Sequence, residues 1–288
     1  MYAVTGITGQ VGGAAARRLL EAGQPVRAVI RNAAKCALWA RKGCEIAVAD
    51  MQDADALAQA FKDADGVFIL PPSEFDPSPG FPEALAVIEA VKQALEIARP
   101  RHVVCLSTIG AQAVQPNLLT QRQLMEEELG KLNIPMTFLR PAWFMENFAW
   151  DVASARDEGV IASFLQPLDK PVPMIATADI GLCAAQLLQE KYEGKRIVEL
   201  EAAKRYSPND VAATFAELLG HPVSAEPVPR ETWGALFKSQ GMKDPIPRIQ
   251  MLDGFNEGWI EFERSPATRQ KGTTGLATVL KALIDAGE

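Results

Sequence analysis

The sequence predicts an α/β protein with a doubly wound parallel sheet and a smaller, mainly helical C-terminal domain. Two observations carry this prediction. Six short apolar runs alternate with helical patterns up to about residue 148, which is typical of a parallel sheet covered by helices on both faces. The first run leads into glycines at every third position, as in Rossmann-type domains. We therefore expect a nucleotide-binding domain over 1–148 and a substrate or partner domain over 149–288, with segments that can cross between them.

The elements of the first domain are predicted to follow one another closely. Strands are expected from Tyr2 to the glycine turn and over 24–31, 44–50, 65–70, 101–107 and 135–140. Helices are expected from the glycine turn to Gly23 and over 32–42, 53–62 (capped by Asp53), 83–98 and 116–132.

The second half is less regular. A helix capped by Thr177 or Asp179 is expected to run through Glu190, followed by a strand over 195–201. The next helix should begin with Ser207 as its N-cap and Pro208 as its first residue, and stop at Gly220. Helices are also expected over 229–240, 247–263 and 274–286.

Composition limits the function classes. Of the 288 residues 48% are hydrophobic and 23% charged, which fits a globular protein with an ample core. The net charge of −7 argues against direct nucleic-acid binding. No apolar run could span a membrane, and the two histidines are too far apart for a histidine-rich metal site, so no metal is expected. Four scattered cysteines and no room for a signal peptide favour a cytoplasmic protein.

The glycine turn is the strongest functional signal. Free backbone N–H groups and the positive end of the helix dipole would point at one spot, which suits a phosphate. We expect Gly6 to make the turn, Gly9 to let the backbone approach a pyrophosphate, and Gly12 to let helix and strand pack closely. The spacing differs from the commoner Gly-x-Gly-x-x-Gly, so the prediction depends on its place between strand and helix. An ordinary glycine-rich turn is the alternative.

The end of the second strand bears on the choice of nucleotide. An acidic residue there binds the ribose hydroxyls of NAD, whereas an arginine accommodates the 2′-phosphate of NADP. Arg31 lies at this position and Lys35 follows, so we favour NADP(H) over NAD(H). A solvated basic pair is the alternative. Asp50, which closes the third strand, is placed either to line the adenine or to cap the following turn.

A loop with five prolines, Pro71–Pro82, follows the fourth strand. Ligands bind beyond the carboxyl ends of the strands in open parallel sheets, and loops this long are usually functional. A simple surface connection is the alternative.

Several strings of residues resemble the NmrA-like group of atypical short-chain dehydrogenases/reductases. They are Gly6–Gly12, Arg31–Lys35, Ala49–Asp53, Leu139–Asn147, 177–182 and 206–211, so the resemblance covers nearly the whole chain. The most specific part is Arg-Pro-x-x-Phe-Met-Glu-Asn at 140–147.

The resemblance implies cofactor contacts by position. For the pyrophosphate they are Gly6, Ile7, Thr8, Gly9, Gln10, Val11 and Gly12, and for the 2′-phosphate Arg31 and Lys35. Asp50 and Met51 would border the adenine, Leu70, Pro71 and Pro72 the ribose, and Phe144, Met145, Glu146 and Asn147 the nicotinamide.

The catalytic centre departs from the resemblance. Short-chain reductases use Tyr-x-x-x-Lys, but the lysine position here is Arg122 and the tyrosine position is Leu118. Arg122 could bind the nicotinamide ribose, or simply be a solvated helix arginine, but it cannot be a general base because arginine keeps its proton in proteins. Glu126, one turn later, predicts a helix salt bridge with Arg122.

Ser107 and Thr108 end the fifth strand, where short-chain reductases carry a serine that helps hold the carbonyl. They can donate a hydrogen bond but cannot supply a proton near neutral pH. Satisfying nearby backbone is the alternative for this pair. Ser107, Thr108 and Arg122 are therefore the catalytic candidates, and none is certain.

Two functions remain open. One is an NADPH-dependent reductase of quinone-like or similar electron-poor acceptors, because the nicotinamide carries the hydride chemistry. Its substrate pocket would include Phe75, Phe81, Trp143 and Phe144. The other is a non-catalytic NADP(H) sensor that regulates a protein partner, as in members of the family without catalytic residues. Either protein would be a monomer or a homodimer.

Overall fold

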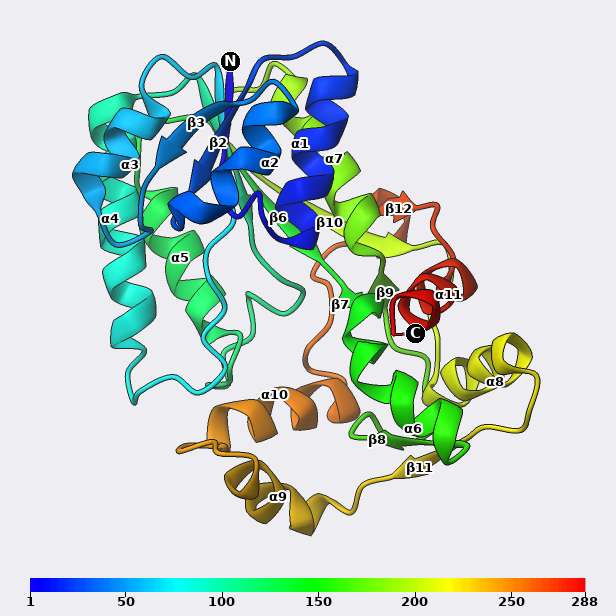
Figure 1. The fold of residues 1–288 in the computed structure, drawn as a ribbon. Helices are drawn as coiled ribbons and strands as arrows, with labels where there is room; N and C mark the ends of the chain where they lie inside the picture. The colour runs from blue at the N-terminus through cyan, green and yellow to red at the C-terminus, as the bar shows by residue number, and fades with distance from the viewer. Residues whose placement is uncertain (288) are drawn as a thin grey trace.

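The computed structural model describes residues 1–287, in which an eight-stranded parallel sheet has the order β12-β10-β6-β5-β4-β1-β2-β3 (Figure 1). Its strands are β1 (Tyr2–Val4), β2 (Val26–Ile30), β3 (Glu45–Val48), β4 (Gly66–Ile69), β5 (His102–Leu106), β6 (Met136–Pro141), β10 (Lys195–Ala202) and β12 (Gln270–Gly272). The predicted doubly wound α/β fold is confirmed.

Helices cover both faces of this sheet (Figure 1). One face carries α1 (Gln10–Glu21), α2 (Cys36–Arg41) and α7 (Thr177–Gln189), and the other carries α3 (Ala54–Phe61), α4 (Pro82–Ala98) and α5 (Thr120–Gly130). Strand β4 is covered on both faces of the sheet, which explains why all its residues are apolar. Phe68 packs into the core on the α1 and α7 side, whereas Val67 and Ile69 pack into the core on the other side.

Helices α1 and α7 cross at very short range. A Cβ atom added to Gly181 of α7 would lie 2.4 Å from the Cβ of Ala14 and 2.7 Å from the backbone nitrogen of Ala15. Only glycine fits at this crossing, so the position of α7 fixes the position of α1 and of the turn before it.

The smaller part of the molecule lies beyond the carboxyl ends of the strands (Figure 1). It contains β7 (Trp143–Phe144), η2 (Met145–Asp151), α6 (Val152–Asp157), β8 (Val160–Ser163), β9 (Met174–Ile175), α8 (Pro208–Leu219), β11 (Ser224–Pro227), η3 (Arg230–Thr232), α9 (Trp233–Ser239), α10 (Ile246–Glu257), η4 (Pro266–Thr268) and α11 (Leu276–Ala286). Because β10 and β12 return to the large sheet, the boundary at residue 148 stays a prediction. Within residues 1–287 no helix has the length and apolar character needed to span a membrane.

Several predicted helix ends are wrong. The helix expected from residue 116 begins at Thr120, because Asn117 forms a turn in which its Oδ1 accepts from the backbone N–H of Leu119 at 2.7 Å. The helix expected to reach residue 263 ends at Glu257, because Gly258 adopts a left-handed φ of 91°. The helix at 32–42 opens with a separate 3-10 turn, η1 (Ala33–Lys35).

The predicted N-caps have mixed outcomes. Asp53 and Ser207 cap α3 and α8 as predicted, with side chains accepting from Ala56 and Asp210 backbone N–H groups. Neither Thr177 nor Asp179 caps α7, whose N-cap position is Ala176. The carboxylate of Asp179 instead accepts from the N–H and the hydroxyl of Thr274, both at 2.9 Å, and thereby holds the segment before α11.

Candidate functional site

The glycine turn has the geometry that a dinucleotide-binding loop needs. Gly6 has a left-handed φ of 62°, as a tight turn requires. A Cβ atom on Gly12 would lie 2.3 Å from the carbonyl oxygen of Gly6, so helix and turn touch through backbone alone. Gly9 is the N-cap of α1, has no side-chain cap, and would meet only the Gly6 carbonyl oxygen, at 3.4 Å. The first-turn N–H groups of α1 therefore remain available for an anion.

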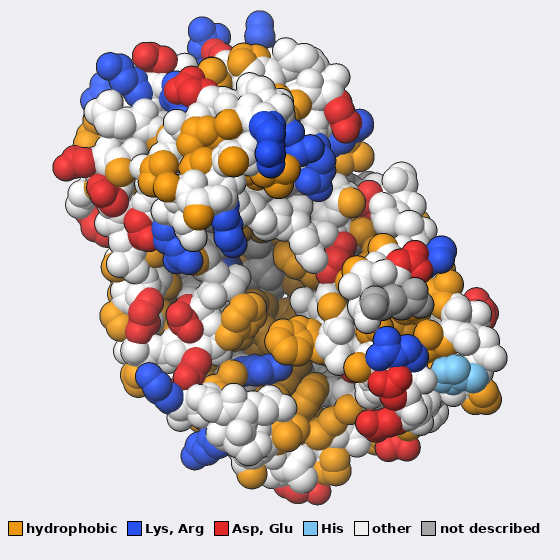
Figure 2. All heavy atoms as spheres, viewed as in Figure 1, with side chains coloured by type: hydrophobic (Ala, Val, Ile, Leu, Met, Phe, Trp, Pro, Cys, Tyr) orange, Lys and Arg blue, Asp and Glu red, His pale blue; other side chains and the backbone are white. Residues whose placement is uncertain are grey.

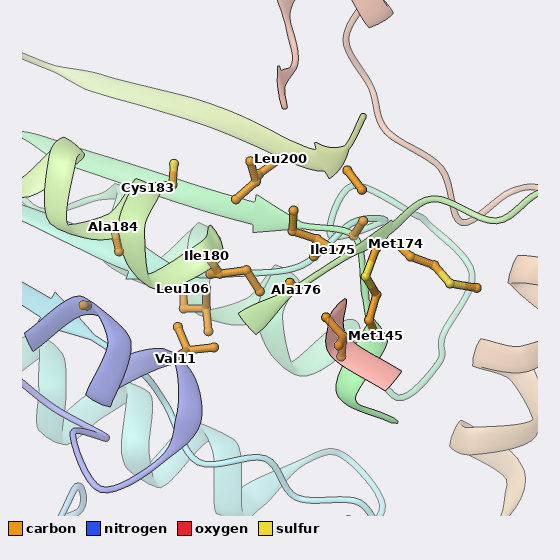
Figure 3. Close-up of a cluster of buried hydrophobic side chains, with 14 of the residues drawn as sticks. Val11, Leu106, Met145, Met174, Ile175, Ala176, Ile180, Cys183, Ala184 and Leu200 are labelled. Atoms are coloured by element: carbon orange, nitrogen blue, oxygen red, sulfur yellow. The ribbon is translucent and has the colours of Figure 1, made fainter. Parts of the chain in front are cut away.

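Several residues of the predicted pyrophosphate loop have buried side chains. Figure 3 shows Val11 of α1 packed toward Leu106 of β5 and Ile180 of α7 in one apolar cluster. Ile7 belongs to the same core and is only 1% exposed. These side chains hold the turn in place, so a phosphate could meet Ile7 and Val11 only through their backbone, whereas the side chains of Thr8 and Gln10 are exposed.

Arg31 and Lys35 stand exposed beyond the end of β2. Between them the side chain of Asn32 accepts a hydrogen bond from the N–H of Ala34 at 2.9 Å and starts the 3-10 turn. Neither basic side chain makes a hydrogen bond or ion pair within residues 1–287. Two cationic groups without acidic partners thus lie close in the chain where a 2′-phosphate is predicted.

Asp50 caps the turn that follows the third strand, which is the second of the two roles predicted for it. Its Oδ1 accepts from the backbone N–H of Gln52 at 3.0 Å. Whether it also borders an adenine, together with Met51, stays a prediction.

A cavity of 180 Å³ opens beside the loop after β4. It brings together residues from just after β2, from the turn before α3, from the loop after β4, and from α4 and α5. The lining residues are Arg31, Gln52, Pro71, Pro72, Ser73, Glu74, Glu83, Ala84, Val87, Ile88, Gln121, Arg122 and Met125. Four of the predicted cofactor residues therefore share one cavity wall, although they come from distant parts of the sequence.

Arg122 does not pair with Glu126, so the predicted helix salt bridge is wrong. Its Nη2 donates instead to the carbonyl oxygens of Pro71 and Pro72, at 3.4 and 3.1 Å, and to the Ser73 hydroxyl at 3.3 Å. Burial lowers the pKa of Arg122 to about 10, which still leaves it charged near neutral pH. Arg122 thus holds the loop that follows β4.

Glu126 pairs with Arg140 of β6. The guanidinium donates to both carboxylate oxygens, at 2.9 and 2.6 Å, and its Nη1 also donates to Gln112 and Glu263. Burial lowers the pKa of Arg140, but the hydrogen bonds and charge of Glu126 outweigh it and raise that pKa. Arg140 is only 4% exposed, so this is a desolvated, bidentate ion pair.

Ser107, a catalytic candidate, donates its hydroxyl proton to Glu126. Because a hydroxyl has one proton, Ser107 then offers only its lone pairs to a ligand. Its predicted role as a donor to a substrate carbonyl is therefore not available in this arrangement. Thr108, the next residue, is partly exposed.

The proline-rich loop bridges the two parts of the molecule. The carboxylate of Asp76 accepts from the backbone N–H groups of Lys243 and Asp244, at 2.8 and 2.9 Å, just before α10. Phe75 is 63% exposed, and Phe81 takes a left-handed φ of 59° at the N-cap of α4. Their place in a substrate pocket stays a prediction.

The string at 143–147 links the parts as well. Trp143 and Phe144 pair with β9, and the Trp143 ring meets Phe255 of α10 edge-on, at 5.2 Å between centroids. Figure 3 shows Met145 pointing into the same buried cluster as Val11, and it is fully buried. The Met145 side chain is therefore part of the core, and its predicted contact with the nicotinamide stays a prediction.

The carboxylate of Glu146 binds the start of α7. It accepts from the backbone N–H of Thr177 at 2.9 and 3.0 Å and from the Thr177 hydroxyl at 2.6 Å. A carboxylate suits the positive end of a helix dipole. The predicted contact of Glu146 with a nicotinamide is untested, but its side chain already has this structural task.

Asp151 ends η2, and burial raises the pKa of its carboxyl to about 6. Since this is above the unfolded value near 4, the folded protein holds a proton that the unfolded chain releases. Stability should therefore fall as pH rises from about 4 to 6, and Asp151→Asn should be more stable than wild type at pH 7, by at most about 3 kcal/mol. Urea denaturation between pH 4 and 8 measures this. Asp157→Asn, whose carboxyl has a lowered pKa, is the control. Equal pH slopes in wild type and Asp151→Asn would contradict the assignment.

Figure 2 shows a hollow between the sheet and the smaller part, beside β7 and α10, with hydrophobic side chains gathered around it. It faces the carboxyl ends of the parallel strands, where open α/β sheets bind ligands. Among residues 1–287 there is no group of three or more His, Cys, Asp or Glu side chains that could hold a metal ion.

The NmrA-like family model matches residues 2–258, which is most of the chain. The chain belongs to the NmrA-like family. Among curated relatives of this NmrA-like protein, the NAD(P)H azoreductase of Xenophilus azovorans is 27% identical over 89% of this chain and 85% of its own length. Quinone oxidoreductase 2 of Escherichia coli is 25% identical over 85% of this chain and 84% of its own.

Solved structures agree on the fold. The Escherichia coli NADPH-dependent quinone oxidoreductase in complex with NADPH superposes with a TM-score of 0.81, at 24% identity, over 98% of this chain and 99% of that one. The Citrobacter triphenylmethane reductase in complex with NADP(H) gives 0.82, at 22% identity, over 98% and 100%. The predicted family is confirmed by the family model.

Proposed function

We propose that this NmrA-like protein binds NADP(H) and is an NADPH-dependent reductase of quinone-like or similarly electron-poor small molecules. The observation that carries the nucleotide assignment is the backbone cradle at Gly6, Gly9 and Gly12, with Arg31 and Lys35 unpaired at the end of β2. The relatives named as an azoreductase and a quinone oxidoreductase support the reductase.

The residues fit the cofactor by charge as well as by shape. The first turn of α1 contains no acidic residue, so its N–H groups would hold the pyrophosphate without repulsion. Arg31 and Lys35 would bind the 2′-phosphate, and Pro71 and Pro72, held by Arg122, would border the ribose. When bound, NADPH supplies a hydride.

The site offers no evident general acid. The hydroxyl proton of Ser107 is directed to Glu126, and Arg122 keeps its protons and holds the loop. A simple ketone needs a proton as the hydride arrives, whereas an electron-poor ring can stabilise the added charge itself. The chemistry of these side chains therefore favours quinone-like acceptors.

Charge reversal tests the phosphate assignment. Arg31→Glu should weaken NADPH binding roughly 10- to 100-fold, because it removes a charge-assisted hydrogen bond and adds repulsion, while NADH binding should change little. Fluorescence titration with both nucleotides measures this. Arg41→Glu, an exposed position at the far end of α2, is the control with the same change in net charge. Equal losses in both variants would contradict the assignment.

Turnover tests the reductase. With NADPH bound, a small panel of quinones should oxidise it with saturable kinetics, followed by the absorbance of the reduced nicotinamide. Tight NADPH binding without oxidation by any acceptor would instead favour a sensor that regulates a protein partner. If neither nucleotide bound, both functions would be excluded.

A further inference from the structure

Arg248 is a basic residue without an acidic partner. It is the only Lys or Arg in α10, and its guanidinium makes no hydrogen bond or ion pair within residues 1–287. The guanidinium carbon lies 4.3 Å from the ring centroid of Phe237. Burial is the cause that lowers the pKa of Arg248, and no carboxylate counteracts it. A partly buried charge without a counter-ion is costly, so an anion brought to it would be well bound.

The surroundings of Arg248 are aromatic. Phe237 is fully buried in a cluster with Trp233, Ile249 and Leu252. Trp143, Phe164 and Met251 pack against this cluster. The buried members offer no free surface, but Trp143, Phe164 and Met251 are partly exposed, so a flat apolar group could pack against these side chains.

The geometry of α10 connects Arg248 to the hollow. Arg248, Met251 and Phe255 are spaced i, i+3 and i+7, so they lie along one side of the helix. A rise of 1.5 Å per residue puts about 10 Å between the first and the last. Phe255 meets Trp143 of β7, one of the elements beside the hollow.

Trp143 supplies a second, independent observation that points to a ligand. Its indole Nε1 is buried and has no hydrogen-bond partner, although Trp233 and Trp259 donate theirs to Val228 and Glu257 at 2.9 Å. An acceptor atom that displaced the side chains covering Nε1 would satisfy it. The indole of Trp143 and the guanidinium of Arg248 thus both lack a hydrogen-bond acceptor.

We propose that the hollow binds an aromatic acceptor that carries an acidic group, a sulfonate or a carboxylate, and that Arg248 binds this group. The inference rests on the proposed reductase and names the class of its substrate. The ring lies against Trp143 and Phe255, and its acidic group reaches the guanidinium across about the length of a two-ring system. Arg248 is a specificity residue, because it binds the acid and takes no part in hydride transfer.

Arg230 offers a matched control. It also lies over an aromatic ring of the cluster, 5.0 Å from the centroid of Trp233. Its charge, however, is neutralised by Asp253, which accepts from Nε and Nη2 at 2.6 Å each. Replacing Arg230 removes a stacked guanidinium without removing an unpaired charge.

Binding of redox-inert probes tests the anion site without turnover. Naphthalene-2-sulfonate and its neutral analogue naphthalene-2-sulfonamide are titrated by calorimetry into the wild-type protein, Arg248→Gln and Arg230→Gln. The wild type should prefer the sulfonate, and Arg248→Gln should weaken sulfonate binding about tenfold or more with little change for the sulfonamide. Arg230→Gln should leave both unchanged. No preference in the wild type, or equal loss in the two variants, overturns the proposal.

Kinetics then separate this inference from the reductase itself. With NADPH, 1,2-naphthoquinone-4-sulfonate is compared with 1,2-naphthoquinone, and Arg248→Gln should raise KM for the sulfonate about tenfold while kcat stays within twofold. If both quinones oxidise NADPH but KM for the sulfonate does not rise in Arg248→Gln, the reductase is supported and the role of Arg248 is overturned. Sulfonate binding without any NADPH oxidation overturns the reductase, and with it the role of the hollow as an acceptor site.

Discussion

Gly12→Ala is expected to destabilise the protein by about 3 kcal/mol and to abolish nucleotide binding, because the added methyl group meets backbone rather than a side chain. The nearest atoms would be the Gly6 oxygen, the Gly6 carbonyl carbon and the Ile7 nitrogen, at 2.3, 2.6 and 2.9 Å. None of them can move without opening the turn. Urea denaturation and NADPH titration measure the two effects.

Two other glycines make the comparison specific. A Cβ atom on Gly130 of α5 would meet nothing within 4 Å, so Gly130→Ala should be neutral or stabilising by up to about 1 kcal/mol. Gly9→Ala should keep the fold but weaken binding, because its methyl group would project where a pyrophosphate approaches. Normal stability and binding in Gly12→Ala would refute the assigned packing.

Arg140→Met is expected to cost 3–5 kcal/mol, roughly what removal of one partner of a buried ion pair costs. It leaves Glu126, whose side chain is only 11% exposed, without its bidentate partner. The double variant Arg140→Met with Glu126→Met should recover most of the loss, because no charge then remains buried. Chemical denaturation of the wild type, the two single variants Arg140→Met and Glu126→Met, and the double variant forms a double-mutant cycle.

The exposed pair Arg18–Glu21 is the reference for this cycle, with side chains 53% and 59% exposed. Arg18→Met should cost less than about 1 kcal/mol. An Arg140→Met variant no less stable than Arg18→Met would show that burial does not set the strength of the pair.

The sheet and the glycine turn could be predicted because their signals are local. Alternating strands and helices determine a parallel sheet, and the backbone atoms that Gly12 packs against belong to Gly6 and Ile7, at most six residues away. The same holds for the caps formed by Asp53 and Ser207, whose partners lie three residues away.

The site could be predicted only in part, because several partners come from distant segments. The i, i+4 rule paired Glu126 with Arg122, but Arg140 on the next strand lies closer and is more deeply buried. The parallel pairing of β8 with β11 joins four-residue strands about sixty residues apart, too short for a clear period. No sequence pattern singles out Arg248, because the absence of an acidic partner is a property of the folded molecule.

The hydrogen bonds of Glu146 affect how mutational data on the most family-specific string should be interpreted. Its carboxylate anchors the start of α7, and Gly181 of that helix seats α1, the helix whose N-terminus follows the glycine turn. An alanine scan would score Glu146 as a nucleotide contact, since its loss would shift the distant phosphate cradle. Measured alone, a fall in affinity at Glu146 would not separate a shift of the two helices from the loss of a bond to the cofactor.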